Sequence, residues 1–447
     1  MIMLIGLITD PVSATIYYVA MTGSDSNPGS AGAPWLTMQK AADTMVAGDT
    51  TIVKNGTYTE GQLVFRTAGT VEARITLRAE NKNLAILSST SSCTPSINFQ
   101  NSYITIDGLR LSVSPSDVLC TSGTTANYYI QMWPPSGARI NGRQTTAAKG
   151  GWVKNVQIDD PSGYRYGAIK ISEDDAIVEN NVVHGDIEAM DSNNVVIRGN
   201  TVYIKSKNGI HTKGGTRNTQ IYDNTVHMTG SSFVQGIVAG GCSCDTCFYD
   251  ETAKIEAYNA AIYNNVVIND NGSTTNSLFM FYSTSNSKIF NNVGINGRGV
   301  QYARSCVSSG LNHPPNHNPV FVNNILVDIG GGSSYIAANV TDFAGTSTIN
   351  YDNFFEFSAS PPQTHPITGD PLFVNISADW HLRAGSPAIG SGTVVTLPAY
   401  PSGILTVQPT KDGVTRPVGS AWDLGIYQTG GAAGDTTPPL TPKLLLH

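Results

Sequence analysis

A short phrase of residues recurs along the middle of the chain: an apolar residue, a variable one, a polar one, an asparagine and a second apolar residue. Successive copies are 26, 19, 24, 41, 27, 32 and 29 residues apart, counted between Asn155, Asn181, Asn200, Asn224, Asn265, Asn292, Asn324 and Asn353. The copies are short, β-branched and without helical periodicity, and repeats of this length predict a solenoid of strands. We expect each asparagine to lie at a turn and to bond to its equivalents one coil above and below.

The two ends of the chain differ from this middle part. Residues 16–60 predict strands and a loop with a short amphipathic helix over 36–46, which would cover the open end of the first coil. The phrase stops near residue 358, and the later text predicts a strand-rich cap. We therefore divide the chain into a residual secretory signal (1–15, with a cloning or gene-calling artefact as the alternative), a β-helix with its N-terminal cap (16–357), a C-terminal cap region (358–430) and a Gly/Pro/Thr linker (431–447).

Composition narrows the class of protein. Only 13% of the residues are charged, 45 are Gly and 23 are Pro, which excludes helical bundles and charge-rich disordered chains. The net charge of −7 argues against a nucleic-acid partner, and the absence of an 18-residue apolar run argues against a membrane span. Six Cys are compatible with export, with Cys93 and Cys120 as one conceivable pair, whereas a zinc site at Cys242, Cys244 and Cys247 is the weaker alternative. We expect a secreted monomer.

Aligning four coils on the repeated phrase locates a cluster of charge. The segments GAIKIS, GDIEAM, GIHTK and GIVAGG begin at Gly167, Gly185, Gly209 and Gly236, and their isoleucines are expected to stack inward. The alternate positions then face outward and gather Lys170, Asp186, Glu188, His211 and Lys213 within about two coils. We expect the neighbouring glycines to leave open space for a ligand. A solvated ladder of opposite charges is the alternative interpretation.

At this point the chain resembles the right-handed parallel β-helix proteins of the pectate-lyase-like superfamily over residues 16–428. The resemblance rests on the opening YYVAMTGSDSNPGS, the asparagine coils and the ending DPLF, DWHL, GSPAIG and DLGIY. It implies an all-β, right-handed parallel β-helix solenoid with an N-terminal helical cap and a C-terminal strand-rich cap. The superfamily includes lyases, hydrolases, epimerases and adhesins, so the resemblance is specific for the fold rather than for the chemistry.

One segment resembles a narrower group. NGIHTK is similar to the N-G-F-x-L-K segment of family 9 polysaccharide lyases, which implies that Lys213 is the Brønsted base. That family also holds calcium with several Asp, for which Asp186, Glu188 and Asp191 are the candidates here. A rival alignment with the chondroitinase and alginate-lyase group would make Glu188 a calcium ligand and place Lys213 at the position of a catalytic Arg.

The chemistry of elimination points to the same cluster. Removing the C5 proton of a 4-linked uronide requires a base and a positive group on the carboxylate. A Lys213 base needs a lowered pKa, which Lys170 and protonated His211 are expected to provide. His211, oriented by Glu188, is the alternative base.

Further residues are expected to bind the substrate. The candidates are Arg217, Asp186, Phe279, Tyr302 and Arg304.

The predicted function is a polysaccharide lyase that cleaves a pectate- or alginate-type acidic polysaccharide by β-elimination. One alternative is an inverting glycoside hydrolase that uses Asp186 and Glu188, which lie two residues apart on a strand and hence about 7 Å apart. The other is a noncatalytic carbohydrate-binding or adhesin module.

Overall fold

The computed structural model describes most of the chain. The described residues are 14–89, 95–113, 129–132, 139–140, 143–144, 148–159, 168–243, 248, 252–306, 311–329, 331, 333, 336–337, 343–344, 346–359, 361–397, 410–417 and 420–429. The predicted linker at 431–447, nearly all of the predicted signal segment, and Cys93, Cys120, Cys244 and Cys247 lie outside these residues.

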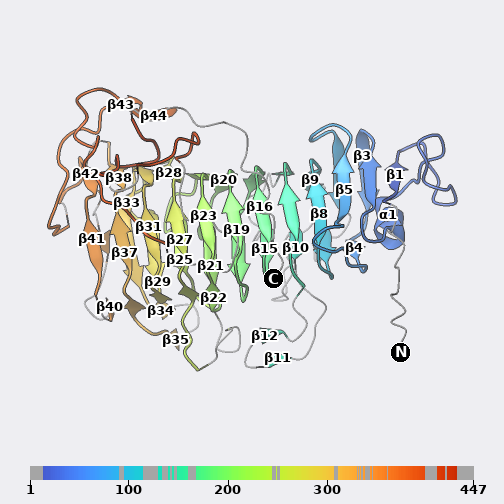
Figure 1. Ribbon diagram of the computed structural model, residues 1–447, viewed down its shortest axis with the longest axis horizontal. Helices are drawn as coiled ribbons and strands as arrows, with labels where there is room; N and C mark the ends of the chain where they lie inside the picture. The colour runs from blue at the N-terminus through green and yellow to red at the C-terminus, as the bar shows by residue number, and fades with distance from the viewer. Residues whose placement is uncertain are drawn as a thin grey trace, which may run out of the picture.

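Three long parallel sheets form the body of the molecule, and successive strands of the chain pass from one sheet to the next (Figure 1). Each strand pairs in parallel register with its equivalent in the next coil, so the coils stack along the long axis of the molecule. This arrangement is the predicted solenoid. Stacking satisfies the backbone of every interior strand, so only the end coils present open edges.

The ten-stranded sheet carries the candidate site. Its strands are β4 (Leu63–Phe65), β7 (Ile97–Phe99), β10 (Ile130–Met132), β15 (Ile169–Ile171), β18 (Ile187–Met190), β21 (Asn208–Lys213), β25 (Gln235–Gly240), β29 (Ser277–Tyr282), β33 (Arg298–Ala303) and β39 (Ile336–Ala337).

The other two long sheets complete each coil. The twelve-stranded sheet contains β1 (Ile16–Val19), β2 (Thr50–Val53), β5 (Ile75–Ala79), β8 (Ile104–Asp107), β13 (Trp152–Lys154), β16 (Ile177–Glu179), β19 (Val196–Arg198), β23 (Gln220–Tyr222), β27 (Ala261–Tyr263), β31 (Lys288–Phe290), β37 (Val320–Val322) and β41 (Thr348–Asn350). The eleven-stranded sheet contains β3 (Gly56–Glu60), β6 (Ala85–Ser89), β9 (Arg110–Val113), β14 (Gln157–Asp159), β17 (Val182–His184), β20 (Thr201–Ile204), β24 (Thr225–Met228), β28 (Val266–Asn269), β32 (Val293–Ile295), β38 (Ile325–Val327) and β42 (Asn353–Phe355).

Smaller sheets flank these three. A five-stranded parallel sheet contains β22 (Thr216–Arg217), β26 (Ala257–Tyr258), β30 (Thr284–Ser285), β36 (Asn316–His317) and β40 (Phe343–Ala344). Three antiparallel pairs are β11 (Arg139–Ile140) with β12 (Arg143–Gln144), β34 (Ser305–Cys306) with β35 (Leu311–Asn312), and β43 (Phe373–Asn375) with β44 (Asp379–Leu382).

The asparagine phrase builds a buried ladder at one turn of each coil. In this ladder, the side-chain Nδ2 group of one asparagine donates to the side-chain oxygen of the next. The linked residues are Asn181, Asn200, Asn224, Asn265, Asn292 and Asn324. Most members follow a residue with positive φ, for example Asn180 and Asn264, a conformation that asparagine tolerates better than most residues. The prediction is confirmed for these six positions.

The ends of this ladder differ from the prediction. Its last member is Asp352, whose Oδ1 accepts from Asn324, and Asn353 instead donates to the carbonyl groups of Ile367 and Gly369. Asn155 lies one residue before the ladder position, since Val156 N–H donates to Asn181 and the Asn155 side chain bonds to Asp107.

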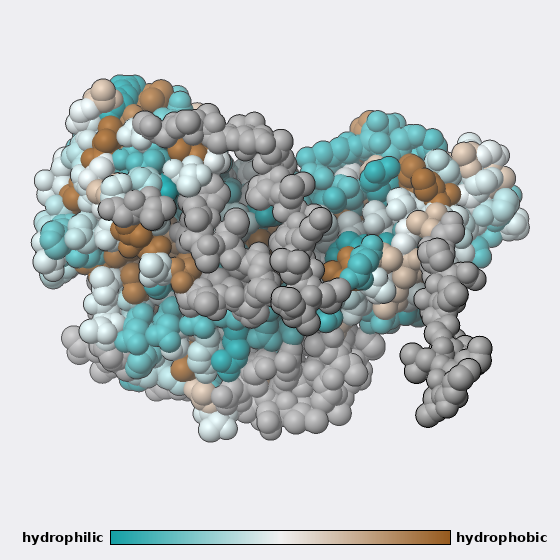
Figure 2. Space-filling model, viewed as in Figure 1, coloured by the Kyte–Doolittle hydropathy of each residue, from teal (hydrophilic) through white to brown (hydrophobic). Residues whose placement is uncertain are grey.

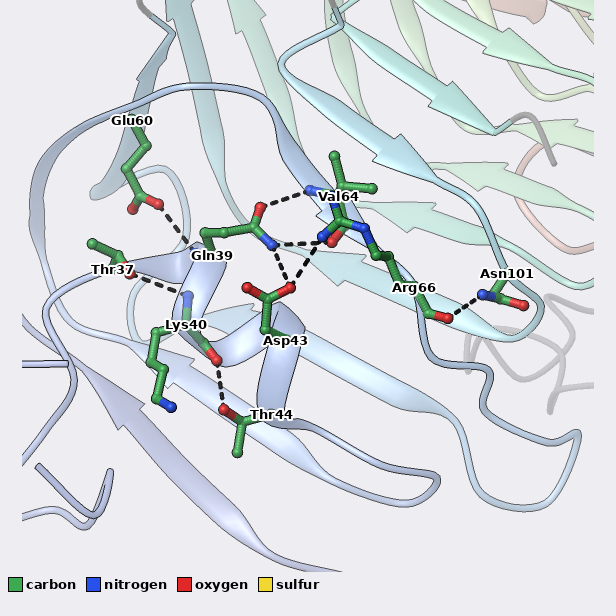
Figure 3. Close-up of polar contacts among 9 residues, drawn as sticks. All are labelled: Thr37, Gln39, Lys40, Asp43, Thr44, Glu60, Val64, Arg66 and Asn101. Carbon is green, nitrogen blue, oxygen red and sulfur yellow. Dashed lines mark hydrogen bonds and ion pairs between the residues drawn. The ribbon is translucent and has the colours of Figure 1, made fainter. Parts of the chain in front are cut away.

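The predicted N-terminal helix is α1 (Met38–Thr44), which packs against β4 at the edge of the ten-stranded sheet. Thr37 caps it, and the carboxylate of Glu60 accepts from the N–H groups of Met38 and Gln39. Figure 3 shows the cap and the bond to Gln39. The Gln39 amide bonds to both the N–H and the C=O of Val64 in place of a neighbouring strand. The helix therefore protects the open edge of the first coil, as a solenoid requires.

The C-terminal region covers the turns of the later coils, and its β-structure among the described residues is the β43–β44 pair. Lys411 donates to the carbonyl of Asp223, Arg416 donates to Asn264, and Asn291 donates to the carbonyl of Asp423. These contacts tie residues 410–428 to coils more than 130 positions earlier. No helix in the described part of the chain is long and apolar enough to cross a membrane.

Candidate functional site

The outward rows of the ten-stranded sheet follow the predicted register. Lys170 pairs with Glu188 and Glu188 with His211, while Met190 pairs with Lys213. The predicted inward row of Ile169, Ile187, Ile210 and Ile237 is fully buried. Strand alternation therefore places the charged side chains of three consecutive coils on one face.

Three cationic or potentially cationic groups converge on one buried carboxylate. The ammonium of Lys170 lies 3.1 Å from Glu188 Oε1, and the ammonium of Lys213 lies 3.0 Å from Glu188 Oε2. His211 Nε2 lies 3.1 Å from the same Oε2. The Glu188 side chain is 5% exposed, whereas those of Lys170 and Lys213 are 14% and 20% exposed. The two ammonium groups are therefore the members of this cluster nearest to solvent.

The pKa of Glu188 is held well below its ordinary value. Burial opposes ionisation, but the charges of Lys213 and Lys170 and the hydrogen bond from His211 outweigh it. The ionised form of Glu188 is therefore favoured by the groups arranged around it.

The pKa of Asp186, in contrast, is raised above its ordinary value. Burial raises its pKa to about 6, with Glu188 adding to the shift and His211 and the lysines opposing it. Its Oδ2 lies 4.0 Å from His211 Nδ1, and its Oδ1 is buried with no hydrogen-bond partner among the described residues. Neighbouring carboxyl groups with pKa values on opposite sides of their ordinary range are typical of catalytic sites.

The predicted lowering of the Lys213 pKa is wrong. Burial alone would lower it, but the contact with Glu188 more than compensates, helped by Glu256 and Asp186, and the pKa of Lys213 is raised. The expected lowering depended on neighbouring cations, but the carboxylate of Glu188 lies between Lys170 and Lys213.

The glycines of these rows do not leave the open space for a ligand that the sequence predicted. A Cβ at Gly209 would lie 2.6 Å from the carbonyl oxygen of Gly236, and one at Gly236 would lie 2.5 Å from that of Leu278. These glycines allow neighbouring coils to approach closely and leave no open space for a ligand. The register also shifts between His211 and Thr212, where β21 pairs with β25, so Thr212 rather than Lys213 pairs with Gly240.

Two predicted substrate-binding aromatics lie in the interior. Phe279 and Tyr302 are 0% and 1% exposed and belong to the hydrophobic core, where Tyr302 stacks on Phe281. Phe279 pairs with the inward Ile237, so the predicted orientation was off by one residue. The predicted role of Phe279 and Tyr302 in stacking on the sugar rings of the substrate is therefore wrong.

Three further predicted residues lie outside the strands that carry the cluster. Arg217 is on β22 of the five-stranded sheet, with its guanidinium 4.2 Å from the ring centre of Tyr258. Arg304 follows β33, and its carbonyl accepts from His313 N–H. Asp191 follows β18 with a positive φ and donates its N–H to the carbonyl of Lys213.

Sequence reasoning missed a buried carboxylate that fixes the turn after Lys213. Glu256 accepts from Gly214 N–H and from both the N–H and the hydroxyl of Ser243, each at 2.7 Å. His313 Nδ1 lies 3.5 Å from the same carboxylate. Ser243 and Glu256 lie within the long 41-residue step between Asn224 and Asn265, which has no periodicity from which such a contact could be foreseen.

The donor set does not suit calcium. One group of potential metal ligands is found among the described residues: Asp186, Glu188 and His211. Each supplies one potential ligand atom, and the three atoms lie within 4.8 Å of one another. Both oxygens of Glu188 already contact cationic groups, one candidate ligand is an imidazole, and Asp191 is outside the group. Calcium prefers six to eight oxygen ligands, so these residues do not fit it. Cys242 is in a disulfide, which removes it from the alternative zinc site.

The same geometry disfavours an inverting hydrolase. One oxygen of Asp186 and one of Glu188 lie within 4.8 Å of each other. An inverting mechanism needs room for a water between two carboxyl groups roughly 6.5–9.5 Å apart. The lysines bonded to Glu188 further occupy the position at which it would act as a base.

Comparison with known proteins supports the fold. Residues 17–156 match the family model described as the Pel9A-like, right-handed β-helix region. The chain is a right-handed parallel β-helix. The Bacillus subtilis (strain 168) protein YwoF is 30% identical over 176 residues, which is 33% of this chain and 36% of that protein. The match thus spans about a third of the length of that relative.

Solved structures with similar folds include several β-helix proteins. The pectate lyase Pel9A superposes with a TM-score of 0.43 at 14% identity, covering 93% of this chain and 97% of that one. XylC in complex with xylose gives a TM-score of 0.47 at 12% identity, covering 94% and 99%. The GH136 lacto-N-biosidase of Eubacterium ramulus gives 0.44 at 14% identity, covering 79% and 65%.

Proposed function

We propose that this protein binds a uronate-containing polysaccharide at the cluster formed by Lys170, Asp186, Glu188, His211 and Lys213, and cleaves it by β-elimination. The observation that carries the proposal is the convergence of Lys170, Lys213 and His211 on the buried Glu188. The two ammonium groups are the members of the cluster nearest to solvent and suit a carboxylate ligand. A chain of low overall charge has few other uses for such a concentration of charge.

Each residue has a chemical role in this proposal. Lys213, the most exposed of the basic groups, accepts the C5 proton when it is deprotonated, and Lys170 neutralises the C6 carboxylate. The C5–H electrons form the C4–C5 double bond, the C4–O bond breaks, and the departing oxygen takes up a proton. Glu188 and His211 hold Lys213 in position.

The raised pKa of Lys213 has a direct consequence for the pH of activity. A base must be unprotonated to accept a proton, so activity is expected to be low at neutral pH and to rise under alkaline conditions. Loss of activity in His211→Ala with retention in Lys213→Ala would instead assign the base to His211, which Glu188 orients through Nε2.

A glycan panel tests the function. Pectate, alginate, glucuronan and a neutral glycan are incubated with the protein at several pH values, with and without a chelator. We expect the ultraviolet absorbance of an unsaturated uronide from at least one acidic glycan, unchanged by the chelator. New reducing ends without that absorbance would replace elimination by hydrolysis, and neither signal on any glycan would favour the noncatalytic binding module.

We also propose that the protein is exported. The disulfide at Cys242 supports this, because structural disulfides persist in oxidising compartments. Recovery of the expressed protein in the cell-free culture medium tests the proposal, and retention inside the cell would contradict it.

A further inference from the structure

A second surface lies on the side of the ten-stranded sheet at which the strands β21 and β25 begin. Lys207 directly precedes β21, and Phe233 lies two residues before β25 in the next coil. The two turns are joined, because Gln235 N–H donates to the carbonyl of Lys207 at 2.7 Å. Lys207 and Phe233 therefore lie on adjacent coils, each just before the start of its strand.

Phe233 is unusual in its exposure, and it lies at a turn with left-handed backbone. Its side chain is 70% exposed, the largest value among the exposed large hydrophobic residues of the described chain, and its φ is +55°. Left-handed backbone is a strained state for a bulky aromatic residue, and strain of this kind concentrates at functional sites. The packing of the fold does not explain a phenylalanine here, since most of the ring is in contact with solvent.

The turn that carries Phe233 is nevertheless held firmly. Phe233 N–H donates to the Thr275 hydroxyl, and Val234 N–H donates to the side chain of Asn276, which is fully buried. Val234 itself is buried and accepts from Ser277 N–H. The chain thus anchors both sides of this position and presents the ring outward.

Lys207 is linked electrostatically to the candidate site. It is exposed and also has a positive φ. Partial loss of hydration and the charge of Lys213 lower its pKa to about 8. Lys207 directly precedes β21 and Lys213 ends it, with five residues between them, so the two lysines lie at opposite ends of the same strand.

We propose that Lys207 and Phe233 form an outer subsite for a uronate unit of the same acidic polysaccharide, with Lys207 facing the carboxylate and Phe233 the apolar face of the sugar ring. This inference rests on the proposed function for the identity of the glycan. Lys207 and Lys213 flank β21, so a chain of several sugar units lying along this strand would reach both positions. The site is therefore built for an oligomer or polymer.

Binding to polyuronate gels tests the inference without requiring turnover. Electrophoresis through gels containing the soluble polyuronate measures retardation of the folded full chain. We expect Phe233→Ala to weaken retardation by roughly fivefold and Lys207→Gln by roughly threefold in apparent affinity. The matched controls are Leu84→Ala and Lys82→Gln, which alter an exposed apolar residue and an exposed lysine in a turn of an early coil and should leave retardation unchanged.

A stability measurement separates a binding role from a structural one. Phe233→Gly should raise the melting temperature, because Gly adopts the left-handed conformation without strain, while it weakens retardation. A lower melting temperature for Phe233→Gly, or wild-type retardation of both Phe233→Ala and Lys207→Gln, would overturn the inference. A change in solution mass on Phe233→Ala with unchanged retardation would overturn it in favour of a contact between copies.

The outcomes distinguish this inference from the proposed function. Cleavage of polyuronate with unaltered retardation of both variants removes the outer subsite and keeps the lyase. Retardation that depends on Lys207 and Phe233 without any cleavage keeps the subsite and removes the lyase. Absence of retardation of the wild-type protein on every polyuronate overturns the subsite whatever the cleavage assay gives.

Discussion

Replacing Glu188 by Gln removes the negative charge on which the cluster is built. The carboxylate contacts Lys170 and Lys213 at 3.1 and 3.0 Å, and it also bonds to His211. A glutamine retains one acceptor oxygen, and its NH₂ group must then face one of the cationic groups. Two ammonium groups therefore lose their counter-ion while remaining largely buried.

The cost to stability follows from this arrangement. Removing one partner of a buried ion pair typically costs about 3–5 kcal/mol. Lys170 and Lys213 are 14% and 20% exposed and can regain some hydration, so we expect a loss of about 3 kcal/mol for Glu188→Gln. Denaturant unfolding monitored by circular dichroism measures it.

The effect on activity has a definite sign. Glu188 keeps the pKa of Lys213 raised, so its neutralisation lowers that pKa and should move the alkaline rise in kcat/KM to lower pH. The matched control is Glu179→Gln, which breaks the buried ion pair with Arg198 on the twelve-stranded sheet. The control should lose stability with an unchanged pH profile. A profile for Glu188→Gln that stays in place or moves to higher pH would refute the reasoning.

Three further changes test other parts of the structure. Asn224→Ala should cost at least about 3 kcal/mol of unfolding free energy, because several buried ladder groups lose their partners, whereas exposed Asn81→Ala should cost under about 0.5 kcal/mol. Phe279→Ala should cost about 3–5 kcal/mol and leave KM unchanged in the protein that remains folded, and a selective rise in KM would restore the predicted role in stacking on sugar rings. Since the pKa of Asp186 is raised to about 6, its stabilisation is present below its ordinary pKa and is lost as pH rises towards 6. Melting temperatures of Asp186→Asn should lack this decline between pH 4 and 6, and an unchanged decline would contradict the assignment.

The coil pattern predicted much of this molecule because a solenoid repeats its local rules. The asparagine phrase marks turns that each need the same buried hydrogen bonds, so Asn181 to Asn324 could be aligned from sequence alone. That alignment gave the correct pairing of Lys170, Glu188 and His211, since the period of two along each strand fixes which side chains face outward.

Prediction failed where that periodicity gives no information. The segment SLFMFYS is apolar on both faces of β29, so alternation could not show that Phe279 faces inward. The hydropathy of the surface does not locate the candidate site either. Apolar residues form scattered patches among hydrophilic ones over the described residues in this view (Figure 2). The contact of Glu256 with the turn after Lys213 joins residues 42 positions apart through an insertion, and such a contact depends on the tertiary fold.

The most direct test of the account is the initial rate of unsaturated-uronide formation by the wild-type protein and by Lys213→Ala at alkaline pH, on the polyuronate that the glycan panel identifies. A positioned general base contributes about 10²–10⁴-fold to a rate, so we predict a loss of at least about 100-fold with binding to the polyuronate gel retained. Lys205→Ala, which removes an exposed lysine outside the cluster, should retain the wild-type rate. Full activity of Lys213→Ala would contradict the account.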